Sequence, residues 1–192
     1  MINRYMYCGY TNSQVNFLKN ENVITASCAY YKDMVFLYYE SFGDIIPEAF
    51  AAASMKPFPD GSFWFKMTDV FHYSTPENEE LWTRKIENKQ PSFELNFLNY
   101  DKIASYIYYH YDHQQGNQYG YDRYGVIFLY KNILVMYHET PYELIEKKEI
   151  EGKEHIPCPE NWDEIMKPHF KNENNKWEVL KAHYLTVGGN DK

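Results

Sequence analysis

Two Tyr-x-Glu motifs are the first residues in this chain whose types and spacing could do chemistry. Tyr38 and Glu40 close one apolar run, and Tyr137 and Glu139 close another. Residues two apart on a strand point to the same face of a sheet, so each tyrosine is expected beside its glutamate. If the two halves of the chain pack about a pseudo-twofold axis, the two carboxylates approach each other. A like-charge pair raises one pKa, which suits general acid–base catalysis.

His138 stands between Tyr137 and Glu139, where the first motif has Tyr39. Histidine is the side chain best suited to proton transfer near neutral pH. We therefore predict Glu139, His138 and Glu40 as catalytic residues, with Tyr38 and Tyr137 in the ligand-binding pocket. The alternative is that both glutamates lie in solvent at strand ends or cap the next helix, and that His138 is an ordinary surface residue.

A second group of candidates is His110-Tyr-Asp-His113, in a segment with helical periodicity. Residues three apart on a helix are neighbours, so the two imidazoles could offer nitrogen ligands to a metal. No second half of a metal motif accompanies them. We predict no metal and no cofactor here, and a solvated helix end. His110 is nevertheless assigned to the mouth of the ligand pocket.

The segment that follows this helix contains several tyrosines and glycines, including Tyr119 and Tyr121. Glycine and asparagine between two periodic segments indicate a loop, and the first half of the chain has no counterpart of this length. We predict that Tyr119 and Tyr121 form an aromatic lid over the pocket. A surface loop without a binding role is the alternative.

An internal repeat indicates which elements must position these residues. The run 31–41, YKDMVFLYYES, matches the run 130–140, YKNILVMYHET, at a constant offset of 99. A Pro-x-Pro-acid sequence follows each run, at Pro57–Asp60 and at Pro157–Glu160, offset by 100. Between them, Ser41-x-x-Asp44 and Thr140-x-x-Glu143 give a third match as helix-capping signals, and three matches in the same order predict a duplication.

Each half is expected to follow the order β-α-β-β-α-β of the ferredoxin-like unit. The predicted fold is therefore α+β, a tandem duplication with halves at residues 1–75 and 92–192 and a linker helix at 76–91. In the first half the expected strands are 4–10, 23–31, 34–40 and 62–74, and the expected helices are 13–20 and 44–54. In the second half the strands are 93–98, 124–130, 133–139 and 177–187, and the helices are 100–111, 141–150 and 162–166.

The hairpin strands are apolar on both faces, which predicts that both faces of each sheet are covered. Packing the two sheets together would achieve this, and the element order then resembles a dimeric α+β barrel fused into one chain. We expect barrel-like packing with a pocket between the two repeats. That architecture hosts several unrelated reactions, so the resemblance alone does not select one.

His72-Tyr-Ser74 and His183-Tyr-Leu185 lie near the ends of the two halves. They are similar to the two H-x-[ST] motifs of the 2H phosphoesterases, which have a duplicated two-lobed fold. The resemblance implies that His72 and His183 act as acid and base on a phosphodiester. Leu185 departs from the pattern, because leucine cannot donate the hydrogen bond that serine or threonine would make.

Composition excludes several classes of protein. The net charge is −8, with 19 basic and 27 acidic residues, which disfavours nucleic acid and anionic membranes as partners. No apolar run approaches the roughly 18 residues of a membrane span. Cys8, Cys28 and Cys158 are odd in number and far apart, which favours free thiols in a reducing compartment, and the N-terminus has no apolar signal region. We predict a cytoplasmic location.

These observations leave three functional hypotheses. The first is small-molecule binding, or cofactor-independent acid–base catalysis, in a pocket between the repeats. The second is a non-enzymatic protein partner, such as an inhibitor or immunity-type protein, because tyrosine and tryptophan favour interface hot spots. The third is a 2H-like phosphodiesterase. No P-loop, G-x-G-x-x-G or G-x-S-x-G motif points to another chemistry.

Overall fold

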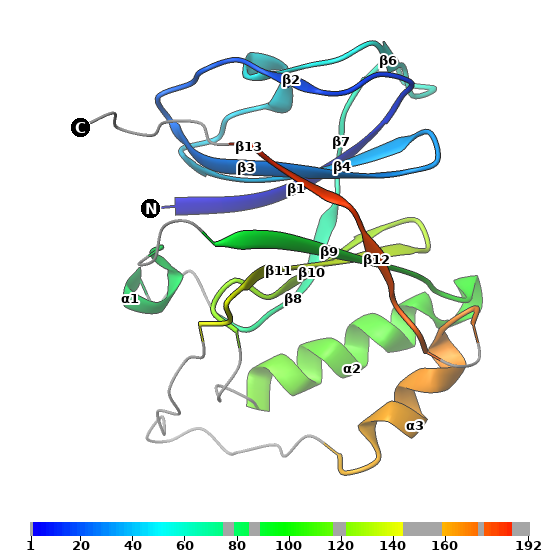
Figure 1. Cartoon of the computed structure of the whole chain (residues 1–192). Coiled ribbons are helices and arrows are strands. Elements are labelled where there is room, and N and C mark those ends of the chain that lie inside the picture. The colour runs from blue at the N-terminus through cyan, green and yellow to red at the C-terminus, as the bar shows by residue number, and fades with distance from the viewer. Residues whose placement is uncertain are drawn as a thin grey trace. The chain divides into compact units, whose positions relative to one another are not determined.

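The computed structural model describes residues 2–74, 79–84, 89–116, 122–143, 159–172 and 175–185. These residues form an α+β structure of antiparallel sheets with a few helices (Figure 1). The chain divides into two compact units. Unit 1 comprises Met1–Met67 and Leu180–Lys192, and unit 2 comprises Thr68–Val179. In the described part of the chain, no helix is long and apolar enough to cross a membrane.

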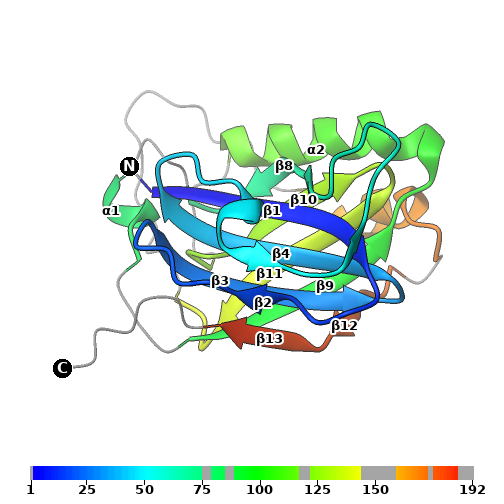
Figure 2. The ribbon, with the colours of Figure 1, turned by 90° about the horizontal axis from the view of Figure 1, so that it is seen from above.

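The sheet of unit 1 has the strand order β13-β3-β4-β1-β6, with β7 also paired to β1. Figure 2 shows β1, β4, β3 and β13 side by side. Each pairing is antiparallel. The strands are β1 (Ile2–Thr11), β3 (Val23–Tyr31), β4 (Met34–Phe42), β6 (Met55–Lys56), β7 (Phe65–Lys66) and β13 (Ala182–Leu185).

Short segments that contain no α-helix cover one face of this sheet. They are β2 (Asn16–Phe17), η1 (Pro47–Ala49) and β5 (Ala51–Ala52), and β2 pairs with β5. Val15, Phe50 and Trp64 are buried there against β3 and β4. The helices expected at 13–20 and 44–54 are therefore wrong. Isolated helices this short are marginal in water, and Pro47 disfavours a helix through residues 44–46, so that only the 3₁₀ turn η1 forms.

The sheet of unit 2 has the strand order β12-β9-β11-β10-β8. Its strands are β8 (Thr68–His72), β9 (Gln90–Phe97), β10 (Val126–Tyr130), β11 (Ile133–Thr140) and β12 (Glu178–Leu180). The helices are α1 (Glu79–Trp82), η2 (Tyr100–Lys102), α2 (Ile103–Gly116), α3 (Trp162–Met166) and η3 (Lys167–His169). The expected linker helix at 76–91 is helical only at α1 within its described residues, and the expected helix at 141–150 falls largely outside the described residues.

Helices α2 and α3 cover one face of the unit 2 sheet (Figure 1). On α2, Tyr106 and His110 are buried, whereas Tyr100, Tyr108 and Tyr111, which the helical periodicity of the sequence places on one apolar stripe, are 60% or more exposed. Tyrosine can lie in either environment, because its ring packs while its hydroxyl accepts water. A helix with tyrosine on every side therefore does not reveal its buried face by periodicity.

The chain passes from one sheet to the other at two points. β7 ends at Lys66 in the unit 1 sheet, and β8 begins at Thr68 in the unit 2 sheet. In the same way, β12 ends at Leu180 beside β9, and β13 begins at Ala182 beside β3. The expected single strands 62–74 and 177–187 are thus each divided between two sheets.

The expected barrel is not found, because both sheets are open. β6 and β13 end one sheet, and β8 and β12 end the other. Closing a sheet requires continuous pairing of its outermost strands. These four strands are only two to five residues long, too short to provide that pairing.

Candidate functional site

The Tyr-x-Glu motif of unit 2 forms a buried ion pair with an arginine. The Tyr137 hydroxyl donates to Glu139 Oε1 at 2.6 Å, and two guanidinium nitrogens of Arg84 donate to the two oxygens of Glu139, each at 2.6 Å. The side chains of Arg84 and Glu139 are 12% and 3% exposed. Bidentate arginine–carboxylate pairs are among the strongest charge-assisted hydrogen bonds. A substrate would have to displace these donors to reach Glu139.

The motif of unit 1 has the same arrangement. The Tyr38 hydroxyl donates to Glu40 Oε1 at 2.8 Å, and Arg4 Nε lies 3.4 Å from the same oxygen. The antiparallel register of β1 and β4 places Arg4 directly opposite Glu40. Neither charged side chain is more than 1% exposed. Both glutamates therefore lie at the centre of buried Tyr–Glu–Arg groups, and neither is a solvated strand end.

His138 and Asp122 form the part of unit 2 best suited to proton transfer. His138 Nε2 lies 3.1 Å from Glu94 Oε1 on the neighbouring strand, and its ring stacks on Tyr142 with centroids 5.2 Å apart. Burial raises the pKa of the Asp122 carboxyl, while backbone N–H groups, chiefly that of Glu143, and the charge of His138 lower it. Sequence reasoning missed Asp122, because a single acid beside a glycine-rich loop carries no motif.

The other charges around Asp122 are paired. Arg123 Nε lies 2.6 Å from Glu143 Oε1, and Lys89 Nζ donates to the carbonyl oxygen of Pro141 at 2.5 Å. Lys89 also lies over the Tyr124 ring, 5.2 Å from its centroid. The result is a network of ion pairs and hydrogen bonds that joins the segments around β10 and β11, in which Asp122 Oδ2 and His138 Nδ1 are buried without a hydrogen-bond partner among the described residues. Such a network fixes local structure more readily than it offers reactive groups.

The predicted catalytic residues belong to different units: Glu40 lies in unit 1, and His138 and Glu139 lie in unit 2. Tyr38 and Tyr137 divide in the same way. The convergence of these five residues on one pocket stays a prediction. Tyr119 and Tyr121, the expected lid, lie outside the described residues.

His110 is a core residue, and the expected solvated helix end is wrong. Its ring lies 4.0 Å from that of Tyr106 and 5.2 Å from that of Trp162, and Nδ1 lies 3.0 Å from the Tyr106 carbonyl oxygen. Burial lowers the pKa of His110 to about 4. Burial also lowers the pKa of His113, which stacks on Phe71. Among the described residues, no group of three potential ligands could hold a metal ion.

His72 has a partner on each ring nitrogen. Nδ1 lies 2.9 Å from Asp69 Oδ2, and Nε2 lies 2.9 Å from Gln114 Nε2. The backbone N–H of His72 donates to Gln114 Oε1, which fixes the amide orientation, so the amide nitrogen donates to Nε2. His72 is then protonated on Nδ1 and has no lone pair left for a substrate. This geometry gives no support to a two-histidine phosphodiesterase, and His183 lies in the other unit.

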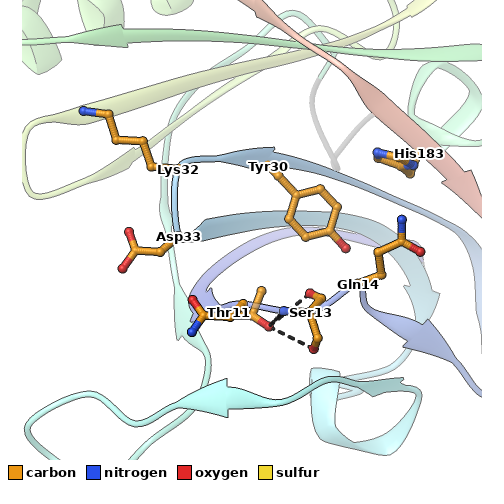
Figure 3. A pocket seen from close by; sticks show the side chains of 8 residues that line it. Thr11, Ser13, Gln14, Tyr30, Lys32, Asp33 and His183 are labelled. Carbon is orange, nitrogen blue, oxygen red and sulfur yellow. Dashed lines mark hydrogen bonds between the residues drawn. The ribbon is translucent and has the colours of Figure 1, made fainter.

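Unit 1 contains a pocket of about 470 Å³ at the end of β1 and the edge of the sheet (Figure 3). Its walls come from strands β3 and β13, from the turn between β3 and β4, and from the loop after β1. Each lining residue carries a polar group: Thr11, Asn12, Ser13, Gln14, Tyr30, Lys32, Asp33 and His183.

Tyr30 occupies the centre of this lining (Figure 3). Its hydroxyl oxygen accepts from the Val15 backbone N–H at 2.8 Å and from the Cys28 thiol at 3.7 Å. Burial raises the pKa of Tyr30 to about 12, so the phenol keeps its proton at neutral pH. The His183 ring stands edge-on to Tyr30, with centroids 5.5 Å apart. The pocket therefore presents a phenol hydroxyl and an imidazole together.

Sequence reasoning named His183 for a different reason and missed the rest of this pocket. Its residues come from positions as far apart as Thr11 and His183, and a polar loop such as 12–14 resembles any other loop before folding. Comparison of the chain with known protein families, with curated proteins and with solved structures finds no match.

Proposed function

We propose that this protein binds a small polar molecule in the unit 1 pocket. The observation that carries the proposal is the set of hydrogen-bonding side chains that the fold leaves unused there. Within the described chain, Asn12, Gln14 and His183 line the cavity without a hydrogen-bond partner for their side chains. Ligand sites combine a cavity of roughly 300–1,000 Å³ with a few polar groups that fix orientation, and this pocket has both.

Binding without catalysis is the better proposal for the groups that are described. The two glutamates expected to act as acid and base are each held by a tyrosine and an arginine. His138 with Asp122 keeps the proton-transfer hypothesis open in unit 2. In unit 1 the pocket has no carboxylate apart from Asp33, which lies 3.6 Å from Lys56 Nζ.

Ligand-observed NMR with a library of small polar metabolites tests this proposal. We expect at least one compound to bind, and the paired substitution Asn12→Ala and Gln14→Ala to weaken it at least fivefold. Gln90→Ala, an exposed residue of unit 2, is the matched control and should leave the affinity unchanged. The proposal would be contradicted if no compound bound, or if the paired substitution left the affinity for the bound compound unchanged.

A protein partner is the second candidate, and the exposed tyrosines of unit 2 favour it. Tyr108 and Tyr111 lie on the outer side of α2, with Tyr100 before them at helical spacing. Because the chain has a net charge of −8, the partner should present a basic surface. A photo-cross-linking residue at position 108 should then capture a basic protein, whereas one at exposed Glu164 should not.

We also propose that the two halves descend from a duplicated ferredoxin-like unit. The core order β1-β4-β3 in unit 1 corresponds to β9-β11-β10 in unit 2. In unit 2, β12 lies beyond β9, which gives the order expected of a βαββαβ unit. Unit 1 departs from the βαββαβ order in two ways. In the described chain no helix lies between β1 and β3, and the strand at the edge of its sheet, β13, lies beside β3.

Details of the two hairpins support the same proposal. Lys32 and Lys131 begin the two-residue turns, with left-handed φ values of 56° and 54°. The turn carbonyl of Asp33 accepts from the Thr11 backbone N–H at 2.8 Å, and that of Asn132 accepts from Leu98 at 2.8 Å. Lys131 and Asn132 follow Lys32 and Asp33 at an offset of 99 residues, the same offset that separates Glu139 from Glu40.

A further inference from the structure

We propose that the ligand of the unit 1 pocket is an uncharged polyhydroxylated molecule, such as a monosaccharide. This inference rests on the proposed function, because it names the class of ligand for the same cavity. Three properties of the pocket carry it: its charges are engaged elsewhere, its loop is held in place by its own hydrogen bonds, and its unused groups are uncharged amides and aromatic rings.

The two charged residues of the lining are not directed at the cavity. Lys32 Nζ lies over the Tyr31 ring, 5.0 Å from its centroid, and in Figure 3 the side chain points away from Tyr30. Asp33 Oδ2 lies 3.6 Å from Lys56 Nζ, in an exposed ion pair. A phosphate or carboxylate ligand requires a cation or a cluster of N–H donors. The cavity therefore directs no lysine cation at Tyr30, which disfavours an anionic ligand.

The loop that forms one wall is fixed before any ligand arrives. Thr11 Oγ1 lies 3.0 Å from the Ser54 carbonyl oxygen, and it also accepts from the Ser13 backbone N–H at 3.0 Å. Ser13 Oγ accepts from the Ser54 backbone N–H at 2.9 Å. These bonds tie residues 11–13 to residue 54 across the loop. Binding then loses little conformational entropy, which favours weak polar ligands.

The groups that remain match hydroxyl chemistry. Each amide of Asn12 and Gln14 offers a donor and an acceptor, and the Tyr30 hydroxyl, whose oxygen already accepts twice, has its proton left to donate. Neighbouring hydroxyls of a sugar are themselves both donors and acceptors. The rings of Tyr30 and His183 offer surface against which the C–H face of a sugar can pack. Aromatic side chains with a polar tip suit such amphipathic ligands.

The test measures the affinity of the full chain for a fixed set of probes by saturation-transfer NMR and calorimetry. The neutral probes are glucose, galactose, mannose and N-acetylglucosamine, and the charged probes are glucose 6-phosphate and glucuronate. We expect at least one neutral sugar to bind, and each charged derivative to bind at least fivefold more weakly than its parent. Tighter binding of glucose 6-phosphate or glucuronate would overturn the inference.

Two variants locate the binding. Gln14→Ala should weaken sugar binding at least fivefold, and His183→Ala should do the same by removing one aromatic wall. Gln90→Ala is the control, and thermal unfolding of each variant shows whether it remains folded. If the metabolite library binds in this pocket and the neutral sugars do not, the ligand class is wrong while the proposed function stands. If neither binds, both proposals fail.

Discussion

Units 1 and 2 share a three-stranded antiparallel core but cover one face of it in different ways. In unit 2, α2 and α3 pack on the sheet through stacked rings such as Tyr106, His110 and Trp162. In unit 1, loops and two-residue strands cover the sheet, and polar side chains hold the loops in place. In a helix the backbone N–H and C=O groups bond to each other, so the side chains that face the sheet can be aromatic rings only. In a loop, polar side chains must bond to the backbone groups that lack such partners. The pocket consequently forms in the unit covered by loops.

The Tyr-x-Glu motif is what the two units have in common at the level of side chains. Both tyrosines donate to their glutamates, and both glutamates pair with an arginine. The arginines come from unrelated places: Arg4 lies on β1 in register with Glu40, whereas Arg84 follows α1. A buried carboxylate requires a partner, and each unit supplies one from a different part of its sequence.

Removing the glutamates should have the largest effect on stability. Glu40→Gln and Glu139→Gln each leave a guanidinium without its carboxylate, which costs about 3–5 kcal/mol when the pair is buried. We expect Glu40→Gln to cost more, because the Arg4 side chain is 1% exposed and the Arg84 side chain is 12% exposed and can turn toward water. Urea denaturation at pH 7 measures both.

The control for this pair is Glu164→Gln, an exposed residue on α3 that should change the free energy of unfolding by less than about 0.5 kcal/mol. A cost near zero for both buried glutamates would remove the structural role assigned to the motif. It would also revive the catalytic hypothesis for Glu40 and Glu139.

Acid should destabilise unit 2 through His110. Its pKa is lowered to about 4 in the folded protein, against about 6.5 in an unfolded chain. Its neutral form is therefore the one that fits the fold, and its contribution is present above pH 6.5. That contribution is lost as the pH falls from 6.5 toward 4, by about 3 kcal/mol in total.

The variant His110→Phe separates this contribution from other acid effects. Phenylalanine retains the ring stacking with Tyr106 and Trp162 but cannot be protonated. Free energies of unfolding at pH 7.5 and pH 4.5 should differ by about 2–3 kcal/mol less in the variant than in the native protein. Equal pH dependence in the two proteins would show that His110 is not the group responsible.

Substitution of one glycine in each unit tests how well its packing accommodates an added methyl group. A Cβ at Gly9 would lie 2.8 Å from the Phe63 carbonyl oxygen and 2.2 Å from Met55 Cε, so backbone as well as a flexible side chain must move. A Cβ at Gly125 would lie 2.5 Å from the Tyr73 ring, a half-buried side chain. We expect Gly9→Ala to cost about 2 kcal/mol and Gly125→Ala about 1. The reverse order in thermal unfolding would show that the unit 1 loops are the more adaptable cover.

The smallest effect should come from the tyrosine hydroxyls of the shared motif. Tyr38→Phe and Tyr137→Phe each remove one hydrogen bond to a glutamate that keeps its arginine. The expected cost is about 1 kcal/mol in each unit, since a single buried hydrogen bond contributes on that order. Chemical denaturation of both variants should give values within about 0.5 kcal/mol of each other. A clearly larger loss in one unit would mean that its tyrosine also orders the arginine.

The sequence by itself determined the local elements whose patterns are complete within a few residues. The hairpins around Lys32-Asp33 and Lys131-Asn132 were predicted to within a few residues at their ends, because apolar runs on both sides of a two-residue turn specify them. The short helix α3 was predicted at its observed bounds. The repeat alone shows that Tyr137 and Glu139 match Tyr38 and Glu40 and that His138 stands where the first half has Tyr39.

Only the tertiary structure decided how those elements are used. The expected helix at 44–54 contains helix-forming alanines, yet Ala51 and Ala52 pair with β2. So short a segment gains too few internal hydrogen bonds to hold a helix alone, and tertiary contacts set its structure. Contacts between residues distant in sequence decide which arginines pair with Glu40 and Glu139 and whether His110 is buried. They also decide which sheet β8 and β13 join. The pocket depends on them most, since Thr11, Tyr30 and His183 meet only after β13 has paired with β3.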